Sequence, residues 1–483
     1  MTFERERPGA LQVLVMSATV VGMLILLALL LTARPAGAQT QDPTAAPSVD
    51  DELLNRIAVL ETQLADLKAA VAARRNGAPA GEASSRGASA ASSGTSAAAQ
   101  DSAFVDALRQ VRVGGSLDLY YGYNFNRPVG RVNLLRAYDV TSNNFTLSQA
   151  SLVLEKAPDV SAGRRFGARL DLQYGQATET LQGSLANEPR PWVYRNIFQA
   201  YGTYVFPLGS GLNVDVGKWA SSIGLESNYT KDQINYSRSY WFDFLPFYHM
   251  GVRASYRASD ALALNYWLTN GAQQSETFND YMDQMFGAVL NPVKSVTWTT
   301  NVYLGQEHPD VEQVVTPGPP LLPTQPGLSV TPIVPAPDGR LHIFDSYATW
   351  QATPRTTFAL EGDYVVSRLW DTPGPGRSTD PSRVYGGALY ARQQVAPRVA
   401  VAARGEYLRD QGGLFTGRTQ SLNEITLTSD FAVADGFLVR AEWRRDGSSA
   451  PFFLTRDEGV FSGHQHTATL GAIWWFGNKQ GAW

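Results

Sequence analysis

The nine residues "FGARLDLQY", positions 166–174, alternate strictly between two kinds of side chain. Even positions are apolar or aromatic, and odd positions are glycine, charged or amide residues. A period of two is the spacing of the two faces of a β-strand, so this stretch predicts a strand with one apolar and one charged face. The stretches "VAVAARGEY" (399–407) and "FLVRAEWRR" (437–445) repeat the pattern. The charged faces of the three stretches carry Arg169, Asp171, Arg404, Glu406, Arg440, Glu442 and Arg444.

Alternation alone does not separate a membrane barrel from a soluble β-sandwich, whose polar face also meets water. The connections between strands are more informative. Strand candidates begin near residues 111, 144, 164, 195, 210, 246, 261, 282, 295, 341, 355, 382, 398, 419, 437 and 464. Connections after odd-numbered strands are long, and those after even-numbered strands are tight turns such as "PLGSG" and "NPVK". This asymmetry is typical of an outer-membrane barrel. We therefore predict an all-β, antiparallel up-and-down transmembrane barrel of about sixteen strands, whose charged face lines a water-filled lumen.

Composition narrows the functional classes. The net charge of −4 provides no basic field to gather nucleic acid, and cysteine is absent, which excludes disulfides and thiol catalysis. Residues 10–33 are almost entirely apolar, and Ala36-Gly37-Ala38 is an A-x-A cleavage pattern. We expect residues 1–38 to be a signal peptide that is cut after Ala38; the alternative is a retained membrane anchor, because about 20 apolar residues span a bilayer.

A heptad segment and a linker precede the barrel. In residues 51–73 the apolar positions are spaced 4, 3, 4, 3, 4, which predicts a short periplasmic coiled coil; an amphipathic helix lying on the main domain is the alternative. Residues 74–103 are rich in Ala, Ser and Gly and predict a flexible linker. The barrel domain then spans residues 111–483. The heptad seam favours a homotrimer, or a contact of residues 51–73 with the cell wall or a periplasmic partner.

The third long connection, residues 220–245, combines rings and charges. Its end and the following strand start read "NYSRSYWFDFLPFYHMGV", residues 235–252. In wide barrels such a loop can fold into the lumen and narrow it, and charged walls are a source of ion selectivity. We expect the aromatic rings to brace the loop against the wall; the alternative is an external loop at the membrane interface. The expected constriction residues are Glu226, Lys231, Asp232, Arg238 and Asp243.

This region also resembles a known family. Gly217-Lys218-Trp219, Gly224 with Glu226, the run Asn235–Ser239, and Pro246–His249 with Gly251 are similar to the signature region of the OmpL-like β-barrel porins. The sequence departs from that pattern at Ser221-Ser222, where Thr-Pro is expected, and at Met250, where Thr is usual. The resemblance covers residues 111–476 and implies an outer-membrane porin, without identifying a solute.

The expected function is passive diffusion of small hydrophilic solutes or ions through an outer-membrane barrel. A structural anchor that joins the envelope to the cell wall through the coiled coil is the alternative. We expect no enzyme, although His249 with Ser237 or Ser239 and Asp232 or Asp243 contains the residue types of a hydrolase triad. We expect no metal and no cofactor, because His464 and His466 have no third ligand in the sequence. The proline-rich residues 307–340 predict an exposed loop with little regular structure.

Overall fold

The computed structural model describes residues 110–181, 188, 190–317, 328–372 and 376–477. The signal peptide, coiled coil and linker expected within residues 1–103 lie outside this range. Among the described residues, no helix has the length and apolarity needed to cross a membrane.

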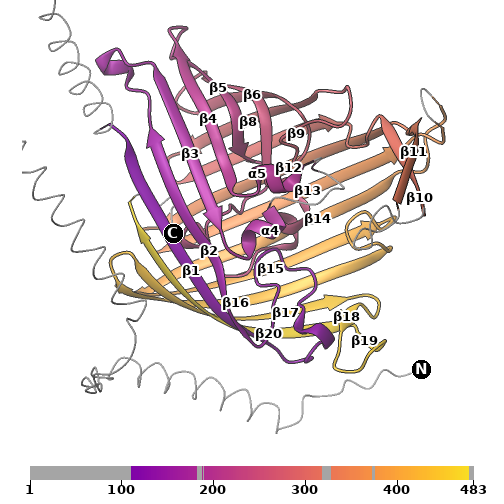
Figure 1. Ribbon diagram of the computed structural model, residues 1–483. Coiled ribbons are helices and arrows are strands. Elements are labelled where there is room, and N and C mark those ends of the chain that lie inside the picture. The colour runs from indigo at the N-terminus through magenta and orange to yellow at the C-terminus, as the bar shows by residue number, and fades with distance from the viewer. Residues whose placement is uncertain (1–109, 182–187, 189, 318–327, 373–375, 478–483) are drawn as a thin grey trace, which may run out of the picture. The chain divides into compact units, whose positions relative to one another are not determined.

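Sixteen antiparallel strands form a closed barrel, which confirms the predicted fold class (Figure 1). Each strand pairs with its neighbours in chain order, and β1 closes the sheet against β20. The barrel strands are β1 (Arg112–Asn124), β2 (Asn144–Lys156), β3 (Phe166–Tyr174), β4 (Ile197–Phe206), β5 (Leu212–Ala220), β6 (Tyr248–Arg257), β7 (Leu262–Thr269), β8 (Asp283–Val293), β9 (Val296–Gly305), β12 (Gly339–Thr353), β13 (Thr356–Leu369), β14 (Ser382–Ala396), β15 (Val399–Gln411), β16 (Gln420–Ala434), β17 (Phe437–Ser448) and β20 (His464–Phe476).

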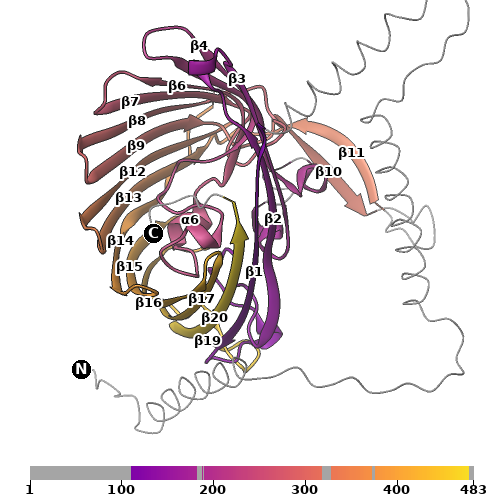
Figure 2. The same cartoon turned by 90° about the vertical axis from the view of Figure 1, so that its left-hand side faces the viewer.

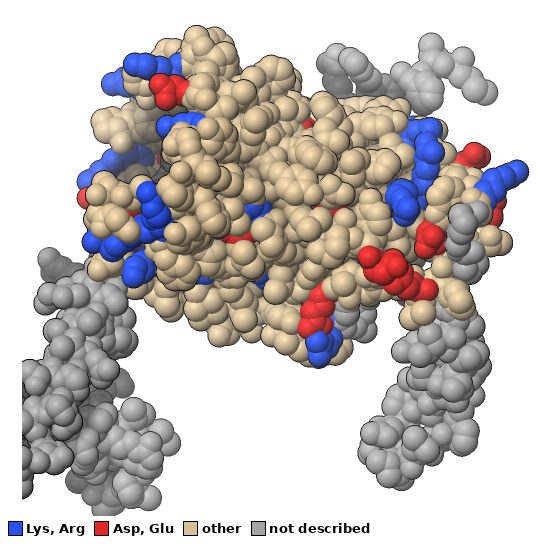
Figure 3. Space-filling view, turned by 90° about the horizontal axis from the view of Figure 1, so that it is seen from above, with Lys and Arg blue, Asp and Glu red and all other residues tan. Residues whose placement is uncertain are grey.

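The strands form because apolar residues alternate with polar ones, and the structure sorts the two kinds to opposite faces. Large apolar side chains remain exposed on the outer face, among them Phe145, Phe166, Leu389, Ile425 and Leu427. Figure 3 shows one side of the molecule on which uncharged residues cover the middle and most charged residues gather toward the two ends. An apolar outer band between charged ends is the surface that a lipid bilayer requires.

The connections differ at the two ends of the barrel. At the short-turn end, turns such as those between β12 and β13 or β14 and β15 are tight. At the long-loop end the connections carry most of the remaining elements: η1 (Val129–Arg131), α4 (Ala177–Leu181), α5 (Pro191–Tyr194), η3 (Thr230–Asp232), α6 (Tyr240–Phe244), β18 (Phe453–Leu454) and β19 (Phe461–Ser462). One short-turn connection, between β2 and β3, contains η2 (Val160–Ala162).

The proline-rich connection differs from its expectation. Its two ends form β10 (Val311–Pro317) and β11 (Leu328–Pro335), which pair as an antiparallel hairpin that projects away from the barrel wall (Figures 1 and 2). Valine and threonine flank the prolines and favour extended pairing. Proline is tolerated in a two-stranded sheet, because one edge of each strand needs no ladder hydrogen bond.

Candidate functional site

Residues 221–247, called the lumen loop below, connect β5 to β6 and fold inside the ring of strands, where α6 is visible in Figure 2. The loop crosses to the wall formed by the first strands. The hydroxyl of Tyr236 donates a 2.9 Å hydrogen bond to Asp118 of β1, and the hydroxyl of Tyr229 donates at 2.7 Å to Asp171 of β3. These two tyrosines therefore attach the loop to the inner face of the wall, as a segment that occupies the lumen requires.

Carboxylates of the wall bind the backbone N–H groups of the loop. Both oxygens of Glu442 on β17 accept, from the N–H groups of Tyr236 at 2.6 Å and Ser237 at 2.8 Å. Glu406 on β15 accepts from the N–H of Tyr240 at 2.8 Å. A buried N–H without a partner would cost about 1–3 kcal/mol, so these carboxylates stabilise an irregular loop that lacks a ladder of its own.

Arginines of the wall bind the backbone carbonyls of the same loop. A guanidinium offers five donors in a fixed plane and can serve several carbonyl oxygens at once. The bonds are Arg404 to the carbonyl of Ser237 at 2.8 Å, Arg440 to those of Asn235 and Gln233 at 2.9 Å each, and Arg444 to that of Arg238 at 2.5 Å. The charged inner face of β15 to β17 thus acts as a template that is complementary to both kinds of peptide group.

Arg238 holds the lumen loop together from inside. Its guanidinium donates to the carbonyls of Asn228 at 2.7 Å, Tyr236 at 2.8 Å and Ser227 at 3.2 Å. It also lies over the ring of Tyr138, 4.9 Å from the centroid. Only 1% of Arg238 is exposed, so this charge joins two arms of the loop and does not face water.

From the sequence, we expect the constriction charges to face each other across water. The exposure of the other four residues also differs from that expectation. Lys231 and Asp232 are buried and pair with each other at 2.7 Å. Glu226 pairs with Arg404 at 2.8 Å. Glu226 and Asp243 alone among the five keep intermediate exposure. The physical reason is that the loop folds on itself and supplies partners for its own charges, as in the pair of Lys231 with Asp232. The wall supplies the opposite charge for Glu226.

All seven wall charges singled out from the sequence lie on the inner face of the barrel. Arg169 and Asp171 pair with each other on β3 at 2.8 Å, and the other five surround the lumen loop. The inner face carries further charges that the sequence analysis did not single out: Asp118, Asp215, Arg253, Arg392, Glu424, Asp430 and Asp446. The alternation of β6, β14 and β16 contains the same signal, because the inward positions follow from their exposed apolar neighbours.

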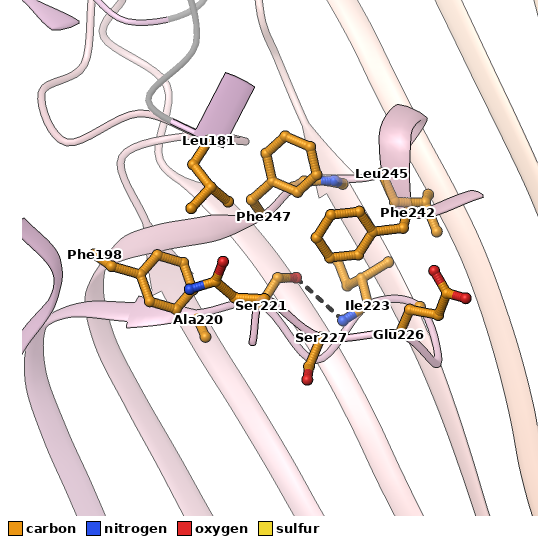
Figure 4. Close-up of a pocket in the computed structure, with 13 residues that line it drawn as sticks. Leu181, Phe198, Ala220, Ser221, Ile223, Glu226, Ser227, Phe242, Leu245 and Phe247 are labelled. Atoms are coloured by element: carbon orange, nitrogen blue, oxygen red, sulfur yellow. Dashed lines mark hydrogen bonds between the residues drawn. The ribbon is translucent and has the colours of Figure 1, made fainter. Parts of the chain in front are cut away.

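Apolar side chains fill the other side of the loop. Phe242 and Phe247 of the loop face Phe198 of β4 and Leu181 of α4 in a small pocket between loop and wall (Figure 4). The rings of Phe242 and Phe247 lie 4.8 Å apart. This packing contributes the hydrophobic part of the free energy with which the lumen loop docks against the wall. The wall charges determine the position at which the loop docks.

A larger cavity lies toward the short-turn end. It has a volume of about 200 Å³ and lies between β1 to β3 and the lumen loop. Its charged lining residues are Arg112, Glu155, Arg169 and Lys231. Three of these four lining residues are cationic, and two of the three form ion pairs, Arg169 with Asp171 and Lys231 with Asp232.

We expect Asp243 of α6 to make the stability of the loop depend on pH. Its side chain keeps intermediate exposure, but its carboxyl is desolvated inside the barrel. This desolvation raises the pKa of Asp243 from 3.8 to about 6, an effect opposed by Arg444 and Arg136 and assisted by Asp139. The folded state then holds a proton that the unfolded state has lost, so its stability should fall as the pH rises from about 4 to about 6. The variant Asp243→Asn should lack that fall and should be more stable than wild type at pH 7.

Denaturant unfolding of the refolded barrel across this pH range measures the effect. Asp457→Asn, at an exposed loop position, is the matched control and should follow the wild-type curve. Parallel curves for Asp243→Asn and wild type would show that the carboxyl of Asp243 is solvated.

The residues of the suggested hydrolase triad do not assemble. His249 lies 3.2 Å from the hydroxyl of Ser221 and 3.2 Å from the carbonyl of Gly271. Ser237 binds Glu442 and Arg404, and Ser239 caps α6 by accepting from the N–H of Phe242 at 2.9 Å. The two candidate nucleophiles therefore have structural roles in the lumen loop.

The chain was compared with family models, curated sequences and solved structures. A family model described as "putative beta-barrel porin-2, OmpL-like" matches residues 110–476. Curated protein sequences contain no match to this chain. Among solved structures, OmpT of Vibrio cholerae in its trimer form aligns with a TM-score of 0.47 and 9% identity, covering 76% of this chain and 99% of that one. The outer membrane channel DcaP of Acinetobacter baumannii aligns at 0.46 and 9%, covering 76% and 97%. OprB of Pseudomonas putida aligns at 0.45 and 12%, covering 78% and 97%.

Proposed function

The chain belongs to the OmpL-like β-barrel porin-2 family of outer-membrane channels, and from that premise we propose that it is a porin through which small hydrophilic solutes diffuse passively, with a preference for anions. We also propose that outer-membrane lipid surrounds the barrel and that the protein forms the homotrimer that the heptad segment favours. The observation that carries the anion preference is a set of three inward arginines at one depth in the barrel, called the arginine ring below.

The arginine ring consists of Arg169, Arg253 and Arg392. Arg169 follows the first residue of β3 by three positions, whereas Arg253 and Arg392 each precede the last residue of their strands by four. All three therefore lie three or four residues inward from the short-turn ends of their strands, on separate parts of the wall. Rings of Arg or Lys are a known means by which a pore selects anions.

Within the described residues the ring arginines form four ion pairs, and in three of them the basic partner is the more exposed one. The side-chain exposures are 9% for Arg169 against 0% for Asp171, 21% for Arg253 against 5% for Asp215, and 16% for Arg392 against 9% for Asp430. In the fourth pair Glu155, 3.7 Å from Arg169, is the more exposed partner, with 30% of its side chain exposed. A solute in the lumen would therefore meet the positive end of three of the four pairs first, which favours anions.

Planar-bilayer recording of the purified, refolded protein tests both parts of the proposal. We expect stable ohmic conductance and, in a KCl gradient, a reversal potential of the sign that chloride preference gives. In the triple variant Arg169→Gln, Arg253→Gln, Arg392→Gln the reversal potential should move toward cations, because the buried carboxylates lose their screens. Arg377→Gln, whose side chain is 91% exposed outside the ring, should behave as wild type.

The outcomes separate the two parts. A silent bilayer from a correctly folded barrel would contradict the porin function itself. Conductance with an unchanged reversal potential in the triple variant would leave the porin function standing and would contradict the role of the arginine ring.

A further inference from the structure

Three carboxylates meet on the inner face of the barrel without a cationic partner. Asp345 of β12 lies directly opposite Asp363 of β13 in the strand register, and Glu361 is two positions along the same strand. One oxygen of each lies within 4.8 Å of those of the other two. Like charges directly opposite in a sheet are destabilising, so this pairing needs a compensating interaction.

Burial and missing hydrogen bonds make the need stronger. Exposure is 0% for Asp345, 1% for Glu361 and 5% for Asp363. Both carboxylate oxygens of Asp363 and one of Asp345 are buried without a hydrogen-bond partner. Within the described part of the chain, none of the three forms an ion pair, and the nearby Arg404 is engaged by Glu226, Glu406 and Glu424.

The lumen loop closes over this cluster with its backbone. The N–H of Leu225 donates to Glu361 at 2.8 Å, and Asn301 of β9 donates both to Asp345 at 2.7 Å and to the carbonyl of Ser222 at 2.9 Å. Gly224 has φ +90°, and a Cβ there would lie 3.3 Å from an oxygen of Glu361. The backbone therefore approaches the carboxylates as closely as only a glycine permits.

We propose that Asp345, Glu361 and Asp363 bind a divalent cation, of which Ca²⁺ fits best, and that this ion fastens the start of the lumen loop to β12 and β13. Hard cations prefer oxygen ligands, and Ca²⁺ binds them at about 2.3–2.6 Å in flexible geometry. Two ligands on opposite sides of such an ion lie up to about 5 Å apart, which includes the observed separations; Mg²⁺, with ligands at about 2.0–2.1 Å, needs a tighter set.

A proton shared by Asp345 and Asp363 is the competing arrangement. It would leave two buried negative charges in the cluster, whereas one Ca²⁺ would leave one. A buried charge without a partner is costly, so the cation neutralises the cluster more completely. The histidines considered in the sequence do not reveal this site, because its ligands are all carboxylates and come together only through the register of two strands.

Calorimetric titration of the refolded, chelator-treated full-length barrel with Ca²⁺ at pH 7 tests the proposal. We expect saturable binding to wild type, and for Asp363→Asn a loss of affinity on the order of 100-fold, because affinity follows the number of charged ligands. Asp371→Asn, which changes an exposed loop carboxylate, should bind as wild type. Asp363→Asn removes a like-charge contact, so the variant should fold at least as well as wild type without the ion.

A second measurement reads the ion through the fold. Ca²⁺ should raise the thermal unfolding temperature of wild type and of Asp371→Asn but not that of Asp363→Asn. No binding to wild type, or equal binding to Asp363→Asn, would overturn the proposal and would point to the shared proton. Neither measurement depends on conductance, so the result stands apart from that of the porin test.

Discussion

Replacing Arg404 with alanine is expected to lower the free energy of unfolding by about 3–5 kcal/mol, the cost of leaving buried carboxylates without their cation. The side chain of Arg404 is fully buried, and its nitrogens lie 2.8 Å from Glu226, 3.0 Å from Glu424 and 3.3 Å from Glu406. The same guanidinium binds the backbone of the lumen loop, so the variant loses both the charge balance of the wall and a contact that positions the loop.

Equilibrium unfolding in guanidinium chloride, followed by tryptophan fluorescence, measures this loss. Arg377→Ala is the control: its side chain is 91% exposed and 3.4 Å from Asp371, and such surface pairs change stability by less than about 1 kcal/mol. If Arg404→Ala unfolded with the midpoint of Arg377→Ala, the carboxylates around Arg404 would have to be neutral in the folded barrel.

The largest change in conductance is expected when the lumen loop is removed. In a chain where a short Gly/Ser linker replaces residues 225–244, conductance should rise several-fold, because a barrel of this strand number is wide enough for an aqueous channel. The reversal potential should also move toward cations. The inner wall that the loop now covers carries three arginines and five carboxylates, namely Arg404, Arg440, Arg444, Glu406, Glu424, Asp430, Glu442 and Asp446.

Single-channel recording compares this variant with one that lacks the projecting hairpin, residues 311–335, which lies away from the barrel wall. The hairpin variant should conduct as wild type. A loop-deleted barrel with wild-type conductance would mean that another segment narrows the channel, and the arginine ring at the short-turn end would then be the first place to look.

The sequence was sufficient for the barrel and for the direction of its charges. Strand starts predicted from alternation lie within two residues of the observed ones, as at 164 for Phe166 and 437 for Phe437. A period of two can be recognised within a single strand, because the alternation of neighbouring residues does not depend on the rest of the fold. The inward position of Arg404, Arg440 and Arg444 follows from the same local pattern.

What each charge touches could not be predicted in this way. Arg238 and Lys231 are buried with partners of the same loop, and this burial depends on how the loop folds inside strands far along the chain. The opposition of Asp345 and Asp363 depends on the register of β12 against β13, where a shift of one residue would separate them. The prolines in residues 307–340 predict a loop with little regular structure. The structure differs, because the two ends of this segment pair, and composition does not show such pairing.

The template for the lumen loop is made last. Asn235 binds Arg440, which follows it by 205 positions, and Tyr240 binds Glu406, 166 positions later. During synthesis and export the loop therefore exists long before the strands that hold it. Its peptide groups must stay hydrated until those strands are in place. Insertion of the C-terminal strands would close the sheet and complete the interior in one event, so a nascent chain that stops before β15 would have neither a sealed wall nor a shaped passage.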